Sequence, residues 1–132
     1  MGYEEITHTA DWALRVWAAD LPGLLTEAAR GMYALMGARP GAGPRARRNL
    51  SIEAYDAETL LVEFLSEALF WVESEKLVFD HFEIHLEGFS AQVEAEGAPY
   101  ETLVKEIKAV TYHNLQVRKT ARGLEAEIVF DV

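Results

Sequence analysis

Apolar residues recur along the chain with two different periods, and the change of period predicts the order of strands and helices. Residues 11–19 alternate between apolar and polar, which predicts a strand after a shorter one over residues 3–8. The next apolar stripe has helical spacing and consists of Leu21, Leu24, Leu25, Ala28, Ala29, Met32, Leu35 and Met36. It predicts a helix that is capped by Asp20 and that ends at Gly37.

A second helical stripe follows another capping aspartate, Asp56, and is the clearest periodic signal in the chain. Its members are Leu60, Leu61, Phe64, Leu65, Ala68, Leu69 and Val72. A strand is predicted on each side of this helix, over Arg48 to Tyr55 and over Leu77 to Leu86. The second of these strands is expected to be irregular near Asp80.

The remaining sequence predicts three more strands. Ser90 to Glu96 is expected to return as the second strand of a hairpin, and Gly97-Ala98-Pro99 to form a turn. Glu106 to Val117 and Leu124 to Val132 form the last predicted pair. They are joined by Arg118 to Gly123, in which Arg122-Gly123 supplies the turn.

These elements predict a single α+β domain over residues 1–132, with two helices packed on one face of a mostly antiparallel sheet. The chain contains no cysteine, which excludes disulfides, thiolate zinc sites and cysteine nucleophiles. No run approaches the roughly 18 apolar residues of a membrane span. The first residues resemble no signal peptide. We therefore expect a cytoplasmic protein.

The net charge of the chain limits the kinds of molecule that it is expected to bind. The 22 acidic residues exceed the 12 basic ones, and the net charge of −10 disfavours unspecific binding to a phosphate backbone. Such a surface suits cations, basic protein partners or solubility alone. One basic island interrupts it, within and after a Gly/Pro-rich loop, and consists of Arg39, Arg45, Arg47 and Arg48. A solvated loop is its ordinary interpretation, and contact with RNA or an acidic partner is the alternative.

Three places could carry chemistry. His8-Thr9-Ala10-Asp11 lies between two predicted strands and could ligate a cation, cap a turn or form an acid/base pair. Lys108 falls in a predicted strand, where a lone lysine is usually a solvated edge residue. Asp131 and the carboxylate of Val132 are adjacent at the end of a predicted strand. They are either a frayed end or half of a cation site.

The same segments carry a family resemblance. Tyr3 to Leu14, Tyr-Glu-Glu-Ile-Thr-His-Thr-Ala-Asp-Trp-Ala-Leu, resembles the N-terminal signature of the archease family. Glu106 to Val117, Glu-Ile-Lys-Ala-Val-Thr-Tyr-His-Asn-Leu-Gln-Val, resembles its C-terminal signature. The ending Val129-Phe130-Asp131-Val132 and the helical segment Ala57 to Glu75, preceded by acidic Asp56, are also similar to the family.

The resemblance implies an accessory factor rather than an enzyme. Archeases assist RtcB-type RNA ligases, which join 2′,3′-cyclic-phosphate or 3′-phosphate ends to 5′-hydroxyl ends in tRNA splicing and RNA repair. The implied activity is faster guanylylation of the ligase histidine, so RNA is reached only through the ligase. The implied core contains a strand–helix–strand–strand unit.

The resemblance also implies a cation site. It nominates Asp11, Asp131 and the carboxylate of Val132 as ligands of a divalent cation. Three carboxylates are hard oxygen donors, which suit Ca²⁺, Mg²⁺ or Mn²⁺ better than a soft metal. Three anions exceed the charge of one divalent ion, so a nearby cationic side chain would reduce their repulsion.

Four further residues are predicted to serve activation. The resemblance implies this role for Lys108, and we group His8, His113 and Asp56 with it because they fall within or beside the matching segments. His8 and His113 are equally candidates for hydrogen-bonded structural histidines.

Two other functions stay open from the residues alone. One is a stand-alone metal-dependent hydrolase or transferase using Asp11, His8 and Lys108. No nucleophile motif supports it, and Gly41-Ala42-Gly43 follows a predicted helix instead of preceding one, unlike a phosphate-binding loop. The other is an RNA-binding chaperone that works through the basic island.

Overall fold

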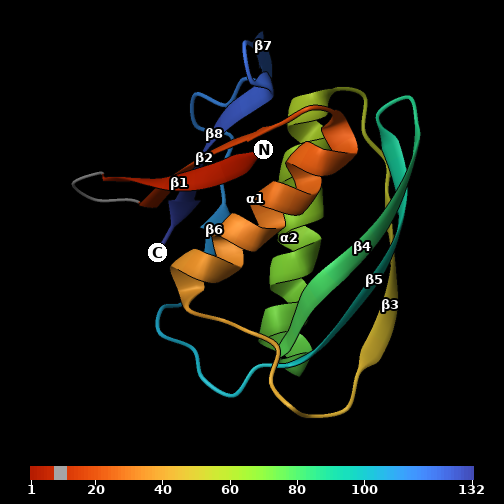
Figure 1. Ribbon diagram of the computed structural model, residues 1–132, viewed down its shortest axis with the longest axis vertical. Coiled ribbons are helices and arrows are strands. Elements are labelled where there is room, and N and C mark those ends of the chain that lie inside the picture. Colours follow the sequence, from red (N-terminus) through yellow and green to blue (C-terminus); the bar gives the residue numbers. More distant parts are fainter. Residues whose placement is uncertain (8–11) are drawn as a thin grey trace.

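The computed structural model describes residues 1–7 and 12–132, and Figure 1 shows their arrangement. In these residues two helices and eight strands follow one another in the order β1-β2-α1-β3-α2-β4-β5-β6-β7-β8, and every strand pair is antiparallel. The predicted α+β class, with two helices and antiparallel strands, is confirmed. The strands divide into two sheets.

The larger sheet unites the two ends of the sequence. Its strand order is β1-β2-β8-β6, and β7 pairs with β8. The strands are β1 (Gly2–Thr7), β2 (Trp12–Ala18), β6 (Ala109–Val110), β7 (Arg118–Thr120) and β8 (Gly123–Asp131). Strand β8 is therefore central, although it is the last strand in the chain.

Helix α1 (Leu21–Met36) begins and ends where the sequence predicts. The Asp20 side chain accepts a hydrogen bond from the Gly23 N–H at 2.8 Å, which satisfies one of the free donors of the first turn. Gly37 ends the helix with φ 66°, a left-handed conformation that glycine adopts without steric cost.

The smaller sheet and α2 form the strand–helix–strand–strand unit. Strand β3 (Ala46–Ile52) leads into α2 (Ala57–Glu75), and β4 (Leu77–Glu87) and β5 (Ser90–Pro99) follow it. The sheet order is β3-β5-β4. Asp56 caps α2 as predicted, because its carboxylate accepts the Thr59 N–H at 2.7 Å.

The irregularity predicted near Asp80 is confirmed, whereas the turn predicted at Gly97-Ala98-Pro99 is wrong. The register of β4 on β5 shifts between Phe79 and His81, so Asp80 is the extra residue of a bulge. Strand β5 continues through Gly97 to Pro99. Position 97 requires glycine because the backbone of β4 approaches it closely. A Cβ added at Gly97 would collide with the Val78 carbonyl.

The long strand predicted over Glu106 to Val117 is also wrong, because only Ala109–Val110 is a strand. Thr111 still donates its backbone N–H to Val129, but its hydroxyl bonds to the same carbonyl at 2.9 Å and the chain then turns away. Asn114 takes φ 50°, which asparagine tolerates better than most residues. The side-chain hydrogen bond of Thr111 thus takes the place of regular strand pairing beyond Val110.

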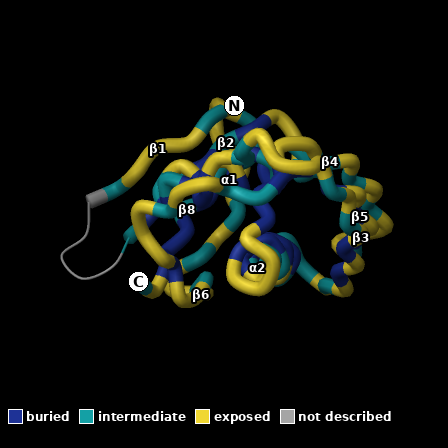
Figure 2. The backbone as a smooth tube through the Cα atoms, turned by 90° about the horizontal axis from the view of Figure 1, so that it is seen from below, coloured by how far each residue is buried: buried dark blue, intermediate teal, exposed yellow. Residues whose placement is uncertain are grey.

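Both helices lie between the two sheets, and their apolar stripes form the core (Figures 1 and 2). Helix α1 packs on β1 and β2 and also reaches β4, while α2 packs on β3 and β4 and reaches β6. The largest fully buried side chains come from both helices and both sheets, and include Leu14, Met32, Phe64, Phe79 and Phe130. In both views the C-terminal residue and the three-stranded sheet lie on opposite sides of the molecule.

Candidate functional site

The segments that carry the family resemblance meet at one end of the five-stranded sheet. Strand β1 ends at Thr7, and Thr7 pairs with Trp12, the first residue of β2. Trp12 pairs in turn with Phe130 of β8, and Ala109 of β6 pairs with Asp131. Residues more than 90 positions apart in the sequence are thus neighbours at the end of the sheet near the C-terminus, which Figure 2 marks with C.

Lys108 and Asp131 are joined through the backbone. The Lys108 N–H donates to the Asp131 carbonyl at 2.8 Å. Both side chains are exposed, and that of Asp131 makes no hydrogen bond or ion pair with another residue of the described part of the chain. The predicted activation lysine and one predicted cation ligand are therefore adjacent, which spacing in the sequence did not reveal.

His8 and Asp11 lie outside the described residues. Their neighbours in the chain are nevertheless placed, since Trp12, which follows Asp11, pairs with Phe130, which precedes Asp131. In the sequence, Asp11 is thus next to Trp12 and Asp131 is next to Phe130, and Trp12 and Phe130 are partners in the β2–β8 pairing.

A shallow hollow beside Val132 contains two lysines. It is lined by Leu103, Val104, Lys105, Glu106, Lys108 and Val132. The Lys105 Nζ lies 5.3 Å from the centroid of the Trp12 ring, within range of a cation–π contact. Sequence reasoning missed Lys105, although its spacing of three residues from Lys108 in an otherwise acidic chain was a usable signal. The two lysines bring positive charge to the hollow beside Val132.

The other predicted activation residues lie elsewhere. Asp56 is at the start of α2, where hydrogen bonds from the Thr59 side chain and backbone lower the pKa of its carboxyl. Tyr112 lies beside it, with a pKa raised by burial and then by the nearby Glu63. His113 lines a different hollow, formed with residues 114, 116, 118, 127 and 129. Its ring nitrogen is 3.3 Å from the amide of the adjacent Asn114, and both residues are exposed.

The basic island is paired with acidic side chains. Arg45 binds Asp80 through two hydrogen bonds of 2.6 and 2.8 Å and reaches Glu96 at 3.2 Å. Hydrogen bonding to Arg45 lowers the pKa of both carboxyls. Arg47 also contacts Glu96, at 3.4 Å. Arg48 binds Glu75 at 2.7 Å. Three of the four arginines are thus engaged within the protein, which weakens the case for an RNA-binding surface.

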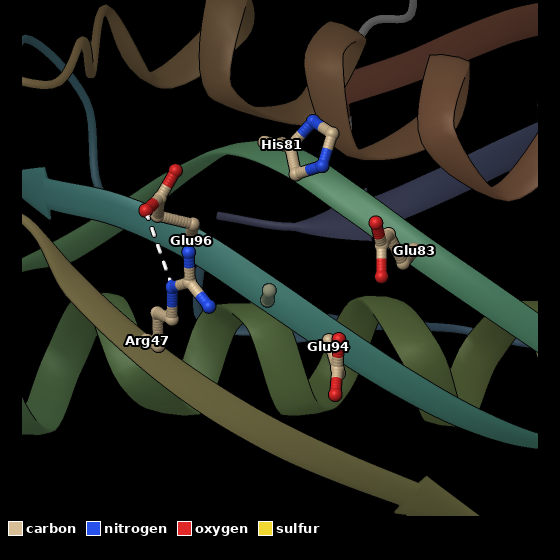
Figure 3. Close-up of a pocket in the computed structure, with 6 residues that line it drawn as sticks. Arg47, His81, Glu83, Glu94 and Glu96 are labelled. Atoms are coloured by element: carbon tan, nitrogen blue, oxygen red, sulfur yellow. Dashed lines mark hydrogen bonds and ion pairs between the residues drawn. The ribbon is translucent and has the colours of Figure 1, made fainter.

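A second group of charged residues lies on the outer face of the three-stranded sheet, and Figure 3 shows it. His81 and Glu83 project from β4, Glu94 and Glu96 from β5, and Arg47 from β3. Glu83 pairs directly with Glu94, an arrangement that costs stability through like-charge repulsion. Among the described residues, no three histidine or acidic side chains are placed to hold one metal ion.

This geometry can be compared with known proteins. Residues 3–132 match the model of the Archease protein family (MTH1598/TM1083). This chain belongs to the archease family. The protein archease of Methanopyrus kandleri is 36% identical over 140 residues, covering 100% of both chains. That of Methanosarcina acetivorans is 33% identical over 142 residues, covering 98% of this chain and 95% of the relative.

Two solved structures share the fold. Protein 1598 of Methanobacterium thermoautotrophicum superposes with a TM-score of 0.74 at 23% identity, covering 99% of each chain. An archease from Thermotoga maritima, described as a possible chaperone, gives a TM-score of 0.69 at 24% identity, covering 98% of this chain and 96% of its own. Both are similar in architecture to the two-sheet arrangement found here. The helices of the described residues include none that is long and apolar enough to cross a membrane.

Proposed function

We propose that this protein is a cytoplasmic accessory factor for an RtcB-type RNA ligase in tRNA splicing and RNA repair. In this proposal it is not an enzyme itself, and it accelerates guanylylation of the ligase histidine. In that step a histidine nitrogen attacks the α-phosphorus of GTP, and pyrophosphate leaves. Such transfers depend on positioning and on neutralising phosphate charge rather than on covalent help from an activator.

The observation that carries the proposal is the meeting of three matching segments at one sheet end. The end of β1, the start of β2, the start of β6 and the end of β8 are neighbours there, and Lys108 and Asp131 are exposed beside them. Membership of the archease family supports the same assignment. Charged side chains on irregular backbone beside a rigid sheet are typical of binding sites.

The proposed cation ligands are Asp11, Asp131 and the carboxylate of Val132. The donor chemistry fits, because exposed carboxylates are the ligands that Ca²⁺, Mg²⁺ and Mn²⁺ prefer. When bound, the cation would supply positive charge for a phosphate of the nucleotide. Lys108 and Lys105 lie in the hollow beside Val132, where they can limit carboxylate repulsion or contact a phosphate of the partner.

The predicted activation residues divide into two groups. Lys108 is proposed to act at the cation site, because its backbone is bonded to Asp131. His8 precedes Asp11 by three positions and is proposed to belong to the same site. Asp56 and His113 do not share that hollow, so we propose that they maintain the backbone of the signature segments instead.

Neither rival function gains support from the contacts. The RNA-binding chaperone would need free arginines, whereas Arg45, Arg47 and Arg48 are paired with carboxylates. A hydrolase or transferase would need a nucleophile beside a base. Among the described residues, those that line the hollow at Val132 are lysines, one glutamate and apolar side chains, and none is a hydroxyl or thiol nucleophile.

The experiment measures transfer of labelled GMP to an RtcB-type ligase in the presence of Mg²⁺ or Mn²⁺. We expect the wild-type protein to accelerate transfer, and Asp11→Asn, Lys108→Ala and Asp131→Asn to reduce the acceleration by about tenfold or more. Glu83→Gln, an acidic residue on the other sheet, is the matched control and should activate normally. Undiminished activation by Asp131→Asn and Lys108→Ala would overturn the proposal.

The role of Val132 has its own test. A tag appended after Val132 removes its carboxylate, whereas the same tag before Met1 does not. We expect only the C-terminal tag to weaken cation binding and activation. Equal activity of the two tagged proteins would remove Val132 from the ligand set.

A further inference from the structure

Three exposed aromatic side chains lie near the first turn of α2 and the turn between β4 and β5. They are Tyr55, Phe89 and Tyr112, whose exposed fractions are 82%, 41% and 52%. Clusters of exposed large aromatic side chains mark interaction surfaces. We call these three residues the aromatic end.

The three residues come from separate segments that bonds hold together. Tyr55 precedes α2, and its neighbour Ala54 donates its N–H to the Ser90 hydroxyl at 3.3 Å. Phe89, which precedes Ser90, lies in the turn between β4 and β5. Tyr112 lies near Tyr55 and the Thr59 hydroxyl, at the first turn of α2.

Neither the turn nor the core requires these residues. A two-residue hairpin turn needs glycine where φ is positive, which Gly88 with φ 62° supplies, so the turn itself does not require a phenylalanine at position 89. Tyr55 immediately precedes the cap of α2, where a hydrophobic residue can pack on the first turn of the helix, but most of its side chain stays exposed. An aromatic residue at two such positions is explained by a partner that covers it.

The surroundings of the aromatic end are acidic. Glu53 lines a hollow with Tyr55 and Ser90, and Glu87 pairs with Ser90 across the hairpin. Glu63 and Asp56 lie close enough to Tyr112 to act on its hydroxyl electrostatically. An apolar surface of tyrosine and phenylalanine rimmed by carboxylates is complementary to lysine or arginine side chains, which stack on rings and pair with carboxylates.

We propose that the aromatic end is a docking surface for a lysine- and arginine-bearing segment of the RNA ligase. The inference rests on the proposed function and adds a second contact to it. Tyr55 and Phe89 adjoin the three-stranded sheet, which lies on the opposite side of the molecule from the C-terminal residue, whereas Tyr112 follows β6. Docking through Tyr55 and Phe89 is therefore separate from the cation site. Its loss lowers affinity for the ligase and leaves the maximum rate of guanylylation intact.

The test measures binding of the protein to an immobilised RtcB-type ligase, together with the guanylylation rate at saturating protein. We expect the double variant Tyr55→Ser/Phe89→Ser to bind at least about tenfold more weakly and to reach the wild-type rate at saturation. Phe70→Ser is the control, because Phe70 is 54% exposed but lies in the second half of α2. It should bind like wild type.

Salt dependence tests the proposed chemistry of the partner. Wild-type affinity should fall between about 50 mM and about 300 mM salt, because the screening length shortens from above to below about 10 Å. The variant Glu53→Gln/Glu87→Gln should show a weaker dependence. A salt slope identical to wild type would overturn the basic character of the partner segment.

The outcomes separate this inference from the proposed function. Wild-type affinity of Tyr55→Ser/Phe89→Ser for the ligase overturns the docking surface alone, provided that wild type binds and activates. Loss of affinity for a single-stranded RNA probe, with ligase binding unchanged, also overturns it and assigns the surface to nucleic acid. Absence of any binding between wild type and ligase overturns both proposals.

Discussion

The β3-α2-β4-β5 unit and the sheet end at Asp131 hold their backbones in different ways. In the former, strands of 10 and 11 residues pair along their whole length and bury one face on α2. At the latter, β6 has 2 residues, and the segment before it is held by single bonds such as that from Val104 N–H to Met36. Regular pairing supplies stability, and irregular backbone presents charged groups that regular strands would space differently.

The two regions differ most in whether their charged side chains are paired within the protein. On the three-stranded sheet, Arg45 and Arg47 are bonded to Asp80 and Glu96, so those charges are satisfied within the protein. At the sheet end, Lys108 and Asp131 are linked only through their backbones. Charges whose partners are internal stabilise a fold, whereas exposed charges on an anchored backbone are available to a ligand or a partner protein.

The largest expected effect is on the free energy of unfolding, and it tests the packing of the β3-α2-β4-β5 unit. Phe64 of α2 is fully buried and packs edge-on against Phe82, with ring centroids 5.3 Å apart. Phe64→Ala should lower the free energy of unfolding by about 3–5 kcal/mol in urea denaturation, because it opens a cavity in the core. Phe70→Ala on the exposed side of the same helix should cost less than about 1 kcal/mol. Equal losses would contradict the described core.

The second effect tests the close approach at the β4 bulge. An added Cβ on Gly97 would meet the Val78 carbonyl and lie 2.7 Å from the Phe79 Cα. Gly97→Ala should therefore cost about 1–3 kcal/mol in unfolding free energy. Gly43→Ala is the matched control, because its Cβ would find Pro99 at 3.7 Å, an ordinary contact. A neutral Gly97→Ala would mean that β5 does not run beside the bulge.

The third effect tests the anchor of the irregular segment. The Thr111 hydroxyl bonds to the Val129 carbonyl and accepts the His113 N–H at 3.3 Å. Thr111→Val keeps the shape and removes both bonds, which should cost about 1 kcal/mol and speed amide hydrogen exchange around His113. Exposed Thr102→Val should change neither quantity. Unchanged exchange in Thr111→Val would show that other contacts hold the segment.

Several features of the fold follow from sequence alone and others depend on distant partners. The cap at Asp56 and the bulge at Asp80 were predictable, because capping and broken alternation are local signals. Gly97 was misassigned to a turn, since the need for glycine there comes from β4 across the sheet. Glu106 to Val117 alternates like a strand, but the Thr111 side chain and the Asn114 turn overrode that pattern.

The candidate site shows the same limit. The residues Lys108 and Asp131 could be nominated from the sequence, but their adjacency depends on the register of β6 on β8. The contact of Lys105 with Trp12 joins an irregular segment to an edge of β2, and no periodicity signals it.

The smallest expected effect is a pH dependence of the paired arginine cluster. Hydrogen bonding to Arg45 lowers the folded-state pKa values of Asp80 and Glu96 from their ordinary 3.8 and 4.5. Their contribution to stability is therefore present above about pH 4.5 and is lost as the pH falls through the lowered values. Arg45→Met should be less stable than wild type at pH 7, and the gap should narrow in thermal melts as the pH falls below about 4. A gap that stays constant or widens as the pH falls would contradict this assignment, and Arg39→Met serves as the control.

One measurement tests most directly whether the sheet end, and not the acidic face of the other sheet, is the cation site. Mn²⁺ broadens the NMR signals of amides within about 15 Å of it through paramagnetic relaxation, with a steep distance dependence. The account predicts that substoichiometric Mn²⁺ broadens Trp12, Lys108 and Asp131 first and leaves Glu83 and Glu94 sharp, and that Asp131→Asn removes the effect. Broadening that begins at Glu83 and Glu94 and survives Asp131→Asn would contradict it.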